Sequence, residues 1–403
     1  MADWRNLAEV AVLPEPGRAF TAAGRDSRDH AHFHRDVLRW RTAFAASPAH
    51  AWALHFEDAA CFAAALYGAW HAGKTVVLPG DALAGTQARL QGRVDGFAGD
   101  WPQATLAAST DDVSATPLQP LDAEAARLVV FTSGSTGEPV AIEKRLRQLD
   151  AEVHALEAAL GTGLEGATVH GTVSHQHIYG LLFRVLWPLS AGRAIVPRAF
   201  FPEDLLAAMD GQDAVLVASP AHLKRLPAQL DWALLHGRLR AVFSSGGVLP
   251  AEAAHEVSRL LGVSPTEILG SSETGGIAWR RWREEQPAWR ALPGVEWRVH
   301  EGVLEVHAPH LSDAAWWRSQ DRAEPDGCGG FRLLGRADRI VKVEERRVSL
   351  DALERQVRAH PAVGDVRVLL LGGSRSALAA VVAMARGLPV PEDAAARRAL
   401  SQA

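Results

Sequence analysis

The sequence contains few cysteines, no excess of basic charge and no long apolar run, and each of these absences excludes a class of protein. Its two cysteines, Cys61 and Cys328, lie far apart and form no metal-ligand pattern, so we expect reduced thiols in a cytoplasmic protein. The net charge of −5 argues against a nucleic-acid partner. The apolar stretch at residues 181–189 is interrupted by Arg184 and Pro188, and the first residues show no signal-peptide pattern, so no membrane partner is expected.

Lysine is also scarce. Only four lysines occur, at positions 74, 144, 224 and 342, which leaves few candidates for any role that requires one. The rest of the composition, with 48% hydrophobic and 22% charged residues, is ordinary for a soluble globular protein. The length of 403 residues is enough for two or three domains with a large core.

The most informative stretch lies at residues 131–139. It follows an apolar run at residues 128–130 that predicts a buried strand. It then combines hydroxyl side chains with two glycines, namely Thr132, Ser133, Gly134, Ser135, Thr136 and Gly137. Glycines let backbone N–H groups turn toward an anion and the hydroxyls add donors, so this composition predicts a phosphate-binding loop. It is not a Walker loop, because Glu138 and Pro139 follow the second glycine, and by itself it could equally be a plain turn.

Two later segments favour the phosphate-binding interpretation. Residues 269–276 place Glu273 among small residues, and one carboxylate together with phosphate oxygens suits Mg²⁺. Residues 335–343 read Gly-Arg-Ala-Asp-Arg-Ile-Val-Lys-Val and continue through Arg347 to Glu354. In this order, the three segments resemble the adenylate-forming superfamily, which comprises acyl- and aryl-CoA synthetases, luciferases and the adenylation domains of peptide synthetases.

The resemblance implies where ATP would bind. It assigns the β- and γ-phosphates to the hydroxyls of the loop, and Mg²⁺ to Glu273, which is also a catalytic residue. It places Gly246 and Gly247 at the adenine edge, and it brings Arg347, a further catalytic residue, toward the phosphate. The other ATP-binding positions that it implies are Leu269, Gly270, Ser271, Ser272, Asp321 and Arg336.

The chain departs from the family pattern at three of these places. The family usually carries a lysine directly after the proline of the loop; here Val140 stands there, and Lys144, four residues on, either binds phosphate or is solvated. Leu269 replaces an aromatic residue that would stack on adenine, which predicts modestly weaker ATP binding. The Thr-Gly pair that normally flanks the aspartate matched by Asp321 is missing.

The same resemblance implies a pocket for the acid. Its residues are His177, Tyr179, Gly246, Gly275 and Gly276. His177 would orient the carboxylate and oppose charge on the oxygen under attack, which makes it a catalytic residue. His175 and His177 could instead be a metal pair, although no nearby carboxylate or cysteine completes a site, or His177 could be a pocket-wall or core histidine without a chemical role.

We expect an α/β fold with a large N-terminal domain, residues 1–334, whose mostly parallel sheets are covered by helices. A small α+β C-terminal domain, residues 335–403, should follow, with Asp351 capping a helix. By the resemblance, Asp338 is the hinge between the two domains. The family's small domain carries a lysine near its far end that has no counterpart here, so we expect an incomplete small domain and slow formation of the adenylate.

The resemblance implies activation of a carboxylic acid by ATP as acyl-AMP, followed by transfer to a thiol as a thioester. The compact length and the motif variants are most similar to small ligases of aryl-polyene and xanthomonadin pigment pathways, which load a hydroxybenzoate-type acid onto an acyl carrier protein. A CoA ligase for an aryl or fatty acid is one alternative, and a catalytically weak nucleotide- or acyl-binding protein is another. Residues 279–283, Trp-Arg-Arg-Trp-Arg, are either a half-exposed strand with solvated arginines or a basic patch for an acidic carrier or a CoA phosphate.

Overall fold

The computed structural model describes residues 4–22, 27–110, 116–133, 139–209, 211–283, 287–312, 315–343, 346–371 and 377–389. The chain divides into two compact units. The first consists of Met1–Glu296 with His307–Ala315, and the second of Trp297–Val306 with Trp316–Ala403. The first unit is α/β and the second is a smaller α+β unit, which confirms the predicted fold class.

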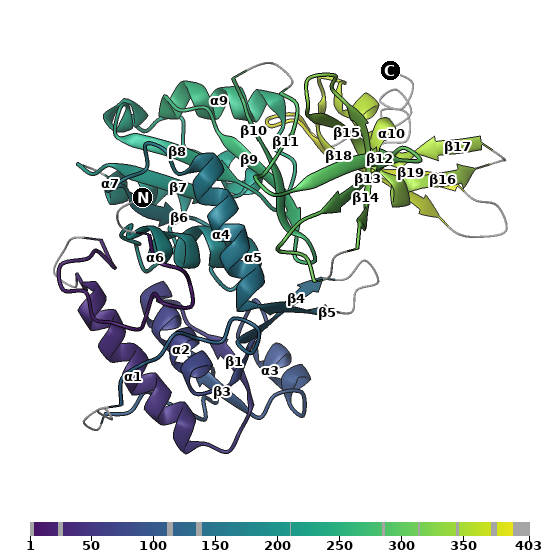
Figure 1. Ribbon diagram of the computed structural model, residues 1–403. Helices are drawn as coiled ribbons and strands as arrows, with labels where there is room; N and C mark the ends of the chain where they lie inside the picture. Colours follow the sequence, from purple (N-terminus) through teal and green to yellow (C-terminus); the bar gives the residue numbers. More distant parts are fainter. Residues whose placement is uncertain are drawn as a thin grey trace. The chain divides into compact units, whose positions relative to one another are not determined.

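Two sheets form the frame of the first unit (Figure 1). The five-stranded sheet has the order β3-β1-β2-β4-β5 and is parallel except for the β4–β5 pair. The six-stranded sheet has the order β11-β10-β9-β8-β7-β6 and is parallel from β6 to β9. The strands are β1 (Ala51–His55), β2 (Thr75–Leu78), β3 (Gly96–Gly99), β4 (Arg127–Ser133), β5 (Pro139–Arg145), β6 (Thr168–Gly171), β7 (Ala214–Ala218), β8 (Leu239–Ser244), β9 (Thr266–Ser271), β10 (Gly275–Arg281) and β11 (Arg290–Ala291).

Helices supply the crossover connections that parallel strands require. Helices α1 and α2 pack against each other closely, because a Cβ atom on Gly68 would lie 2.4 Å from the Cβ of Trp40. The helices of this unit are α1 (His30–Ala46), α2 (Ala59–His71), α3 (Ala84–Leu90), α4 (Leu146–Leu160), α5 (Ile178–Leu181), the π-helix η1 (Leu182–Leu186), α6 (Trp187–Ala191), η2 (Pro202–Asp204), α7 (Leu205–Met209), α8 (Pro220–Leu223), η3 (Trp232–Leu235) and α9 (Ala251–Leu261).

The apolar stretch at residues 181–189 lies in the core of this unit, from the last residue of α5 through η1 into α6. The guanidinium of Arg184 is buried there and donates to the backbone carbonyls of Val173, over 2.7 Å, and Arg198, over 2.9 Å. Buried polar groups need such partners, so the arginine is compatible with an apolar surround. Within the described ranges, no helix is both long enough and apolar enough to cross a membrane.

In its described residues, the second unit contains a four-stranded sheet of order β12-β13-β14-β15, two hairpins, one α-helix and one short 3-10 helix. The elements are β12 (Glu296–His300), β13 (Val303–His307), β14 (Trp317–Pro325), β15 (Phe331–Arg336), η4 (Ala337–Arg339), β16 (Ile340–Val343), β17 (Arg346–Ser349), α10 (Leu350–Arg358), β18 (Val363–Leu371) and β19 (Ala377–Met384). A small apolar core joins α10 to the β18–β19 hairpin through Leu350, Val363, Val366 and Val368.

The predicted cap of helix α10 is wrong. The N-cap is Ser349, whose hydroxyl accepts a hydrogen bond from the backbone N–H of Ala352 over 3.2 Å. Asp351 lies in the first turn and binds elsewhere, as described below. The start of the mobile domain at Gly335 and the hinge role of Asp338 stay predictions.

Candidate active site

The hairpin of β9 and β10 presents Glu273 at its turn. Ser271 pairs with Gly275 across the two strands. The backbone N–H of Ser271 donates to the hydroxyl of Thr274 over 3.1 Å, and the backbone N–H of Thr274 donates to the hydroxyl of Ser271 over 3.2 Å. A Cβ atom on Gly270 would lie 2.3 Å from the carbonyl oxygen of Gly275. The turn is therefore tightly specified, and we find no hydrogen bond or ion pair from the Glu273 carboxylate to any residue that the structure describes.

Lys144, on β5, reaches this turn. Its Nζ donates to the backbone carbonyl of Glu273 over 2.7 Å, and its side chain is buried. Burial lowers the pKa of the ammonium, while the nearby carboxylates of Glu152 and Glu273 oppose that shift. A solvated Lys144 is therefore excluded, and the lysine is engaged with the main chain of the turn that carries Glu273. Its predicted contact with phosphate stays a prediction.

Two further ionisable residues, Glu152 and His310, lie in the same buried region. Glu152, on α4, accepts a hydrogen bond from the backbone N–H of Gly276 over 2.5 Å, and burial raises the pKa of its carboxyl to about 7. Burial lowers the pKa of the His310 imidazole to about 4, and the positive charge of Lys144 adds to this shift. The sequence analysis missed both residues. Glu152 stood on the apolar face of α4, three residues after Leu149, and this was the available signal.

The Gly246–Gly247 loop lies beside the base of the hairpin. Strand β8 runs parallel to β9, with Ser244 opposite Glu267. The hydroxyl of Ser245 donates to the backbone carbonyl of Ile268 over 2.9 Å. Gly246 has a φ of +83°, and both glycines are exposed. The structure thus brings the predicted adenine-edge glycines next to the predicted positions on β9, of which Leu269 is half-buried and Gly270 and Ser271 are exposed. Ser272, which follows β9, is half-buried.

His177 precedes helix α5 as its N-cap residue and is exposed. Its imidazole lies against the backbone of the β2 loop, since a Cβ atom on Gly80 would be 2.8 Å from the His177 Cε1. Partial burial of the ring lowers its pKa, which Asp81 opposes. Tyr179 packs on Phe183 with ring centroids 4.8 Å apart. Burial raises the pKa of the Tyr179 hydroxyl.

The hypothesis that His175 and His177 form a metal pair finds no support in the described structure. His175 is buried against the ring of Phe62, with centroids 4.9 Å apart, and burial lowers the pKa of its imidazole to about 3. Across the described part of the chain, no group of three or more His, Cys, Asp or Glu residues could hold a metal ion. His175 therefore behaves as a core histidine, and the role of His177 in an acid pocket stays a prediction.

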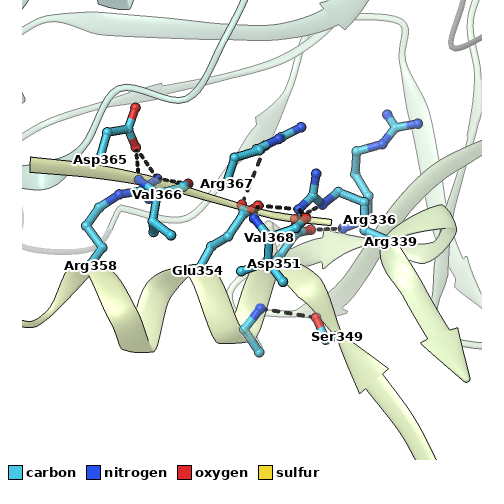
Figure 2. A network of polar contacts seen from close by, with 11 residues as sticks. Arg336, Arg339, Ser349, Asp351, Glu354, Arg358, Asp365, Val366, Arg367 and Val368 are labelled. Carbon is cyan, nitrogen blue, oxygen red and sulfur yellow. Dashed lines mark hydrogen bonds and ion pairs between the residues drawn. The ribbon is translucent and has the colours of Figure 1, made fainter. Parts of the chain in front are cut away.

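The hinge motif in the second unit is tied to helix α10 by a network of charged groups (Figure 2). Asp351 accepts from the backbone N–H of Arg336 over 2.9 Å and forms an ion pair with Arg339 over 2.5 Å. Arg339 also pairs with the buried Glu354. Arg336 lies opposite Asp321 in the β14–β15 ladder, so two predicted nucleotide-binding positions are cross-strand neighbours.

Several predicted site residues lie outside the described part of the structure. Gly134, Ser135, Thr136 and Gly137 belong to the undescribed segment 134–138, and the side chains of Thr132 and Ser133, although on β4, are also undescribed. The same holds for the side chains of Asp338 and Arg347. The predicted phosphate contacts therefore stay predictions.

The arginine run at residues 279–283 is not a uniform surface patch. Arg280 forms an ion pair with the buried Glu267 over 2.6 Å and stacks on Trp282 and Trp289, 4.6 and 4.4 Å from the ring centres. The expectation of solvated arginines is wrong at this position. Arg283 is exposed, and Arg281 is half-buried.

Comparisons with known proteins agree with this arrangement. The family model for "AMP-binding enzyme" matches residues 42–306. A 4-coumarate–CoA ligase from Rhodobacter capsulatus is 32% identical over 260 residues, which are 62% of this chain and 62% of that protein. The chain therefore spans less than two thirds of the length of this curated relative.

Solved structures share the fold. The O-succinylbenzoate coenzyme A synthetase of Bacillus subtilis in complex with AMP matches with a TM-score of 0.81 at 16% identity, over 98% of this chain and 91% of that one. ATP-bound MatB from Rhodopseudomonas palustris matches with a TM-score of 0.80 at 20% identity, over 98% and 92% of the two chains. At these identities the likeness concerns the fold alone.

Proposed function

Because this chain belongs to the AMP-binding enzyme family, we propose that it activates a small carboxylic acid with ATP and transfers the acyl group to a thiol. The observation that carries the proposal is the position of Glu273 at the tight turn of a hairpin whose strand β9 adjoins the exposed Gly246–Gly247 loop. Its carboxylate has no hydrogen-bond or ion-pair partner among the residues that the structure describes. A carboxylate and an exposed glycine loop, both following the carboxyl ends of neighbouring parallel strands, suit a nucleotide with its metal ion.

In the proposed first step, a carboxylate oxygen of the acid bonds to the α-phosphorus of ATP, and pyrophosphate leaves. In the second step, the thiol sulfur bonds to the acyl carbon, AMP leaves with the bridging oxygen, and the thiol proton passes to solvent. The residues of the chain contribute chiefly by binding and orienting the reactants. Glu273 would hold Mg²⁺, an ion that accepts one or two protein carboxylates and would offset charge on the triphosphate.

We expect an aromatic acid of the hydroxybenzoate type, with His177 and Tyr179 at its pocket. The motif variants support this expectation, and so do the names of relatives, which include a 4-coumarate–CoA ligase and a 4-chlorobenzoate–CoA ligase from Arthrobacter. The test is to incubate the chain with ATP, Mg²⁺ and a panel of aromatic and aliphatic acids, and to detect AMP esters by mass spectrometry. Binding of ATP without any AMP ester would instead support the hypothesis of a weak nucleotide-binding protein.

The thiol acceptor has two candidates. The names of the relatives favour CoA, whereas the motif variants favour an acyl carrier protein. Burial of Arg280 weakens the argument for an extended basic patch, which leaves Arg281 and Arg283. Thioester formation from CoA and from phosphopantetheinylated carrier should be compared directly, with an Arg281→Ser, Arg283→Ser variant alongside. A lower rate in that variant with carrier alone would favour the carrier. The cytoplasmic location expected from the cysteines stays a prediction.

A further inference from the structure

Glu267 is a buried carboxylate that no step of the proposed reaction uses. Its side chain is only 2% exposed, yet it lies on β9 directly before the predicted nucleotide-binding positions. It accepts hydrogen bonds from the backbone N–H of Leu249 over 2.9 Å, from Nε of Arg280 over 2.7 Å and from Nε1 of Trp282 over 2.7 Å. A carboxylate is the one side chain of this size that accepts from several donors at once without donating.

These three donors come from two different parts of the site. Leu249 closes the Gly246–Gly247 loop, whereas Arg280 lies near the end of β10, the strand that follows the turn of Glu273, and Trp282 comes directly after that strand. The loop is also held at its other end, where the Ser245 hydroxyl donates to the carbonyl of Ile268. Between these two tethers the loop is exposed.

We propose that Glu267 is a positioning residue, which fixes the Gly246–Gly247 loop relative to the hairpin of Glu273 and thereby sets affinity for the adenine nucleotide. This inference rests on the proposed function, because it takes the loop and the hairpin as two walls of one nucleotide site. Glu267 itself faces the interior of the fold and acts through the loop.

The two carboxylate oxygens of Glu267 accept the hydrogen bonds from Leu249, Arg280 and Trp282. A glutamine at position 267 keeps the shape of the side chain, but it offers one acceptor oxygen and turns an NH₂ group toward donors. The guanidinium of Arg280 is charged and only 16% exposed, so it is the donor for which loss of its partner costs the most free energy. The remaining oxygen should therefore stay with Arg280, and the backbone N–H of Leu249 should lose its partner and release the loop.

The test compares Glu267→Gln with Glu256→Gln, a matched control on α9 whose carboxylate is half-exposed and pairs with Arg259. Dissociation constants for AMP and ATP are measured by calorimetry, and amide exchange of residues 246–249 by mass spectrometry. Loss of one buried hydrogen-bond partner predicts an AMP dissociation constant about tenfold higher in Glu267→Gln. It also predicts faster exchange in the loop, with neither change in Glu256→Gln. In turnover with acyl-AMP, KM should rise by a larger factor than kcat falls.

A double variant, Glu267→Met with Arg280→Met, is used in case Glu267→Gln fails to fold. It removes both charges of the ion pair, so neither is left without its partner. It leaves the N–H of Leu249 without its acceptor, so the same weakening of AMP binding is expected. Wild-type affinity and loop exchange in a folded variant would overturn the inference while leaving the proposed function intact. A wild-type chain that binds neither AMP nor ATP would overturn the proposed function, and the inference with it.

Discussion

Lys144 and Glu273 are joined by a hydrogen bond from the lysine Nζ to the backbone carbonyl of the glutamate, over 2.7 Å. The bond fixes the turn of the β9–β10 hairpin through its main chain, and the carboxylate of Glu273 has no hydrogen-bond or ion-pair partner in the described ranges. Substitution at Glu273 therefore keeps the bond, whereas substitution at Lys144 removes it. The two variants separate the chemistry of the carboxylate from the position of the turn.

Glu273→Gln should abolish most acid-dependent ATP–pyrophosphate exchange, by at least about a hundredfold. The melting temperature should stay close to that of the wild type, because the carboxylate makes no hydrogen bond or ion pair within the described structure. Assays of ATP–pyrophosphate exchange and thermal melts on the same preparation measure the loss of activity and the unchanged melting temperature. An unchanged exchange rate would remove Glu273 from the metal site.

Lys144→Met should lower both stability and exchange. The variant leaves the carbonyl of Glu273 without its donor and the buried Glu152 without its neighbouring cation, so we expect the free energy of unfolding to fall by about 2–4 kcal/mol. The rate of ATP–pyrophosphate exchange should fall by at least about tenfold, because the turn that carries Glu273 is no longer fixed by the hydrogen bond from Lys144. Lys224→Met, at an exposed lysine, is the control. If the two variants matched in denaturant unfolding and in exchange, the hydrogen bond would have no role.

Glu152→Gln should change how stability depends on pH. The pKa of Glu152 is raised from 4.5 to about 7, so between these values only the folded chain keeps the proton, and stability falls as pH rises. His310 acts in the opposite direction between about pH 4 and 6.5, because its lowered pKa leaves only the unfolded chain protonated. The charge of Lys144, which opposes the shift in the pKa of Glu152, is present in the wild type and in the variant alike.

Removal of Glu152 should therefore make stability rise more steeply from pH 5 to 6.5 than in the wild type. Urea unfolding at several pH values measures this slope. A variant curve parallel to the wild-type curve would show that Glu152 titrates normally.

Asp351→Asn should loosen the hinge motif (Figure 2). Asp351 binds the backbone N–H of Arg336 on one side of Asp338 and the side chain of Arg339 on the other, so one carboxylate holds both flanks of the predicted hinge. Amide exchange of residues 335–340 should become about tenfold faster, the effect of losing one hydrogen bond of about 1.4 kcal/mol. Asp365→Asn, which removes an exposed pair with Arg358, is the control. Equal exchange in the two variants would contradict the role of Asp351.

Local patterns in the sequence were sufficient to identify helices, strands and turns that depend on residues close together in the chain. Asp58 precedes an alanine-rich run and caps α2 by accepting hydrogen bonds from the backbone N–H groups of Ala60 and Cys61. The apolar residues within 363–371 lie in strand β18. The small residues around Glu273 form a tight turn between β9 and β10.

Tertiary contacts decided the rest. His30, His32 and His34 alternate as in a strand, but they begin helix α1, because Asp29 caps it by accepting from the backbone N–H of His32. No local sequence pattern predicts the hydrogen bond from Lys144 to the carbonyl of Glu273, 129 positions later. Contacts of this kind depend on how distant strands pair, which a single sequence does not reveal.

The central claim is that a carboxylate oxygen of the acid attacks the α-phosphorus of ATP. The most direct test supplies the accepted acid with ¹⁸O in its carboxyl group, together with ATP, Mg²⁺ and the thiol, and analyses the nucleotide by mass spectrometry. The account predicts AMP that carries one ¹⁸O atom, because the bridging oxygen of the acyl-AMP leaves with the nucleotide. Unlabelled AMP, or label found only in inorganic phosphate beside ADP, would contradict it.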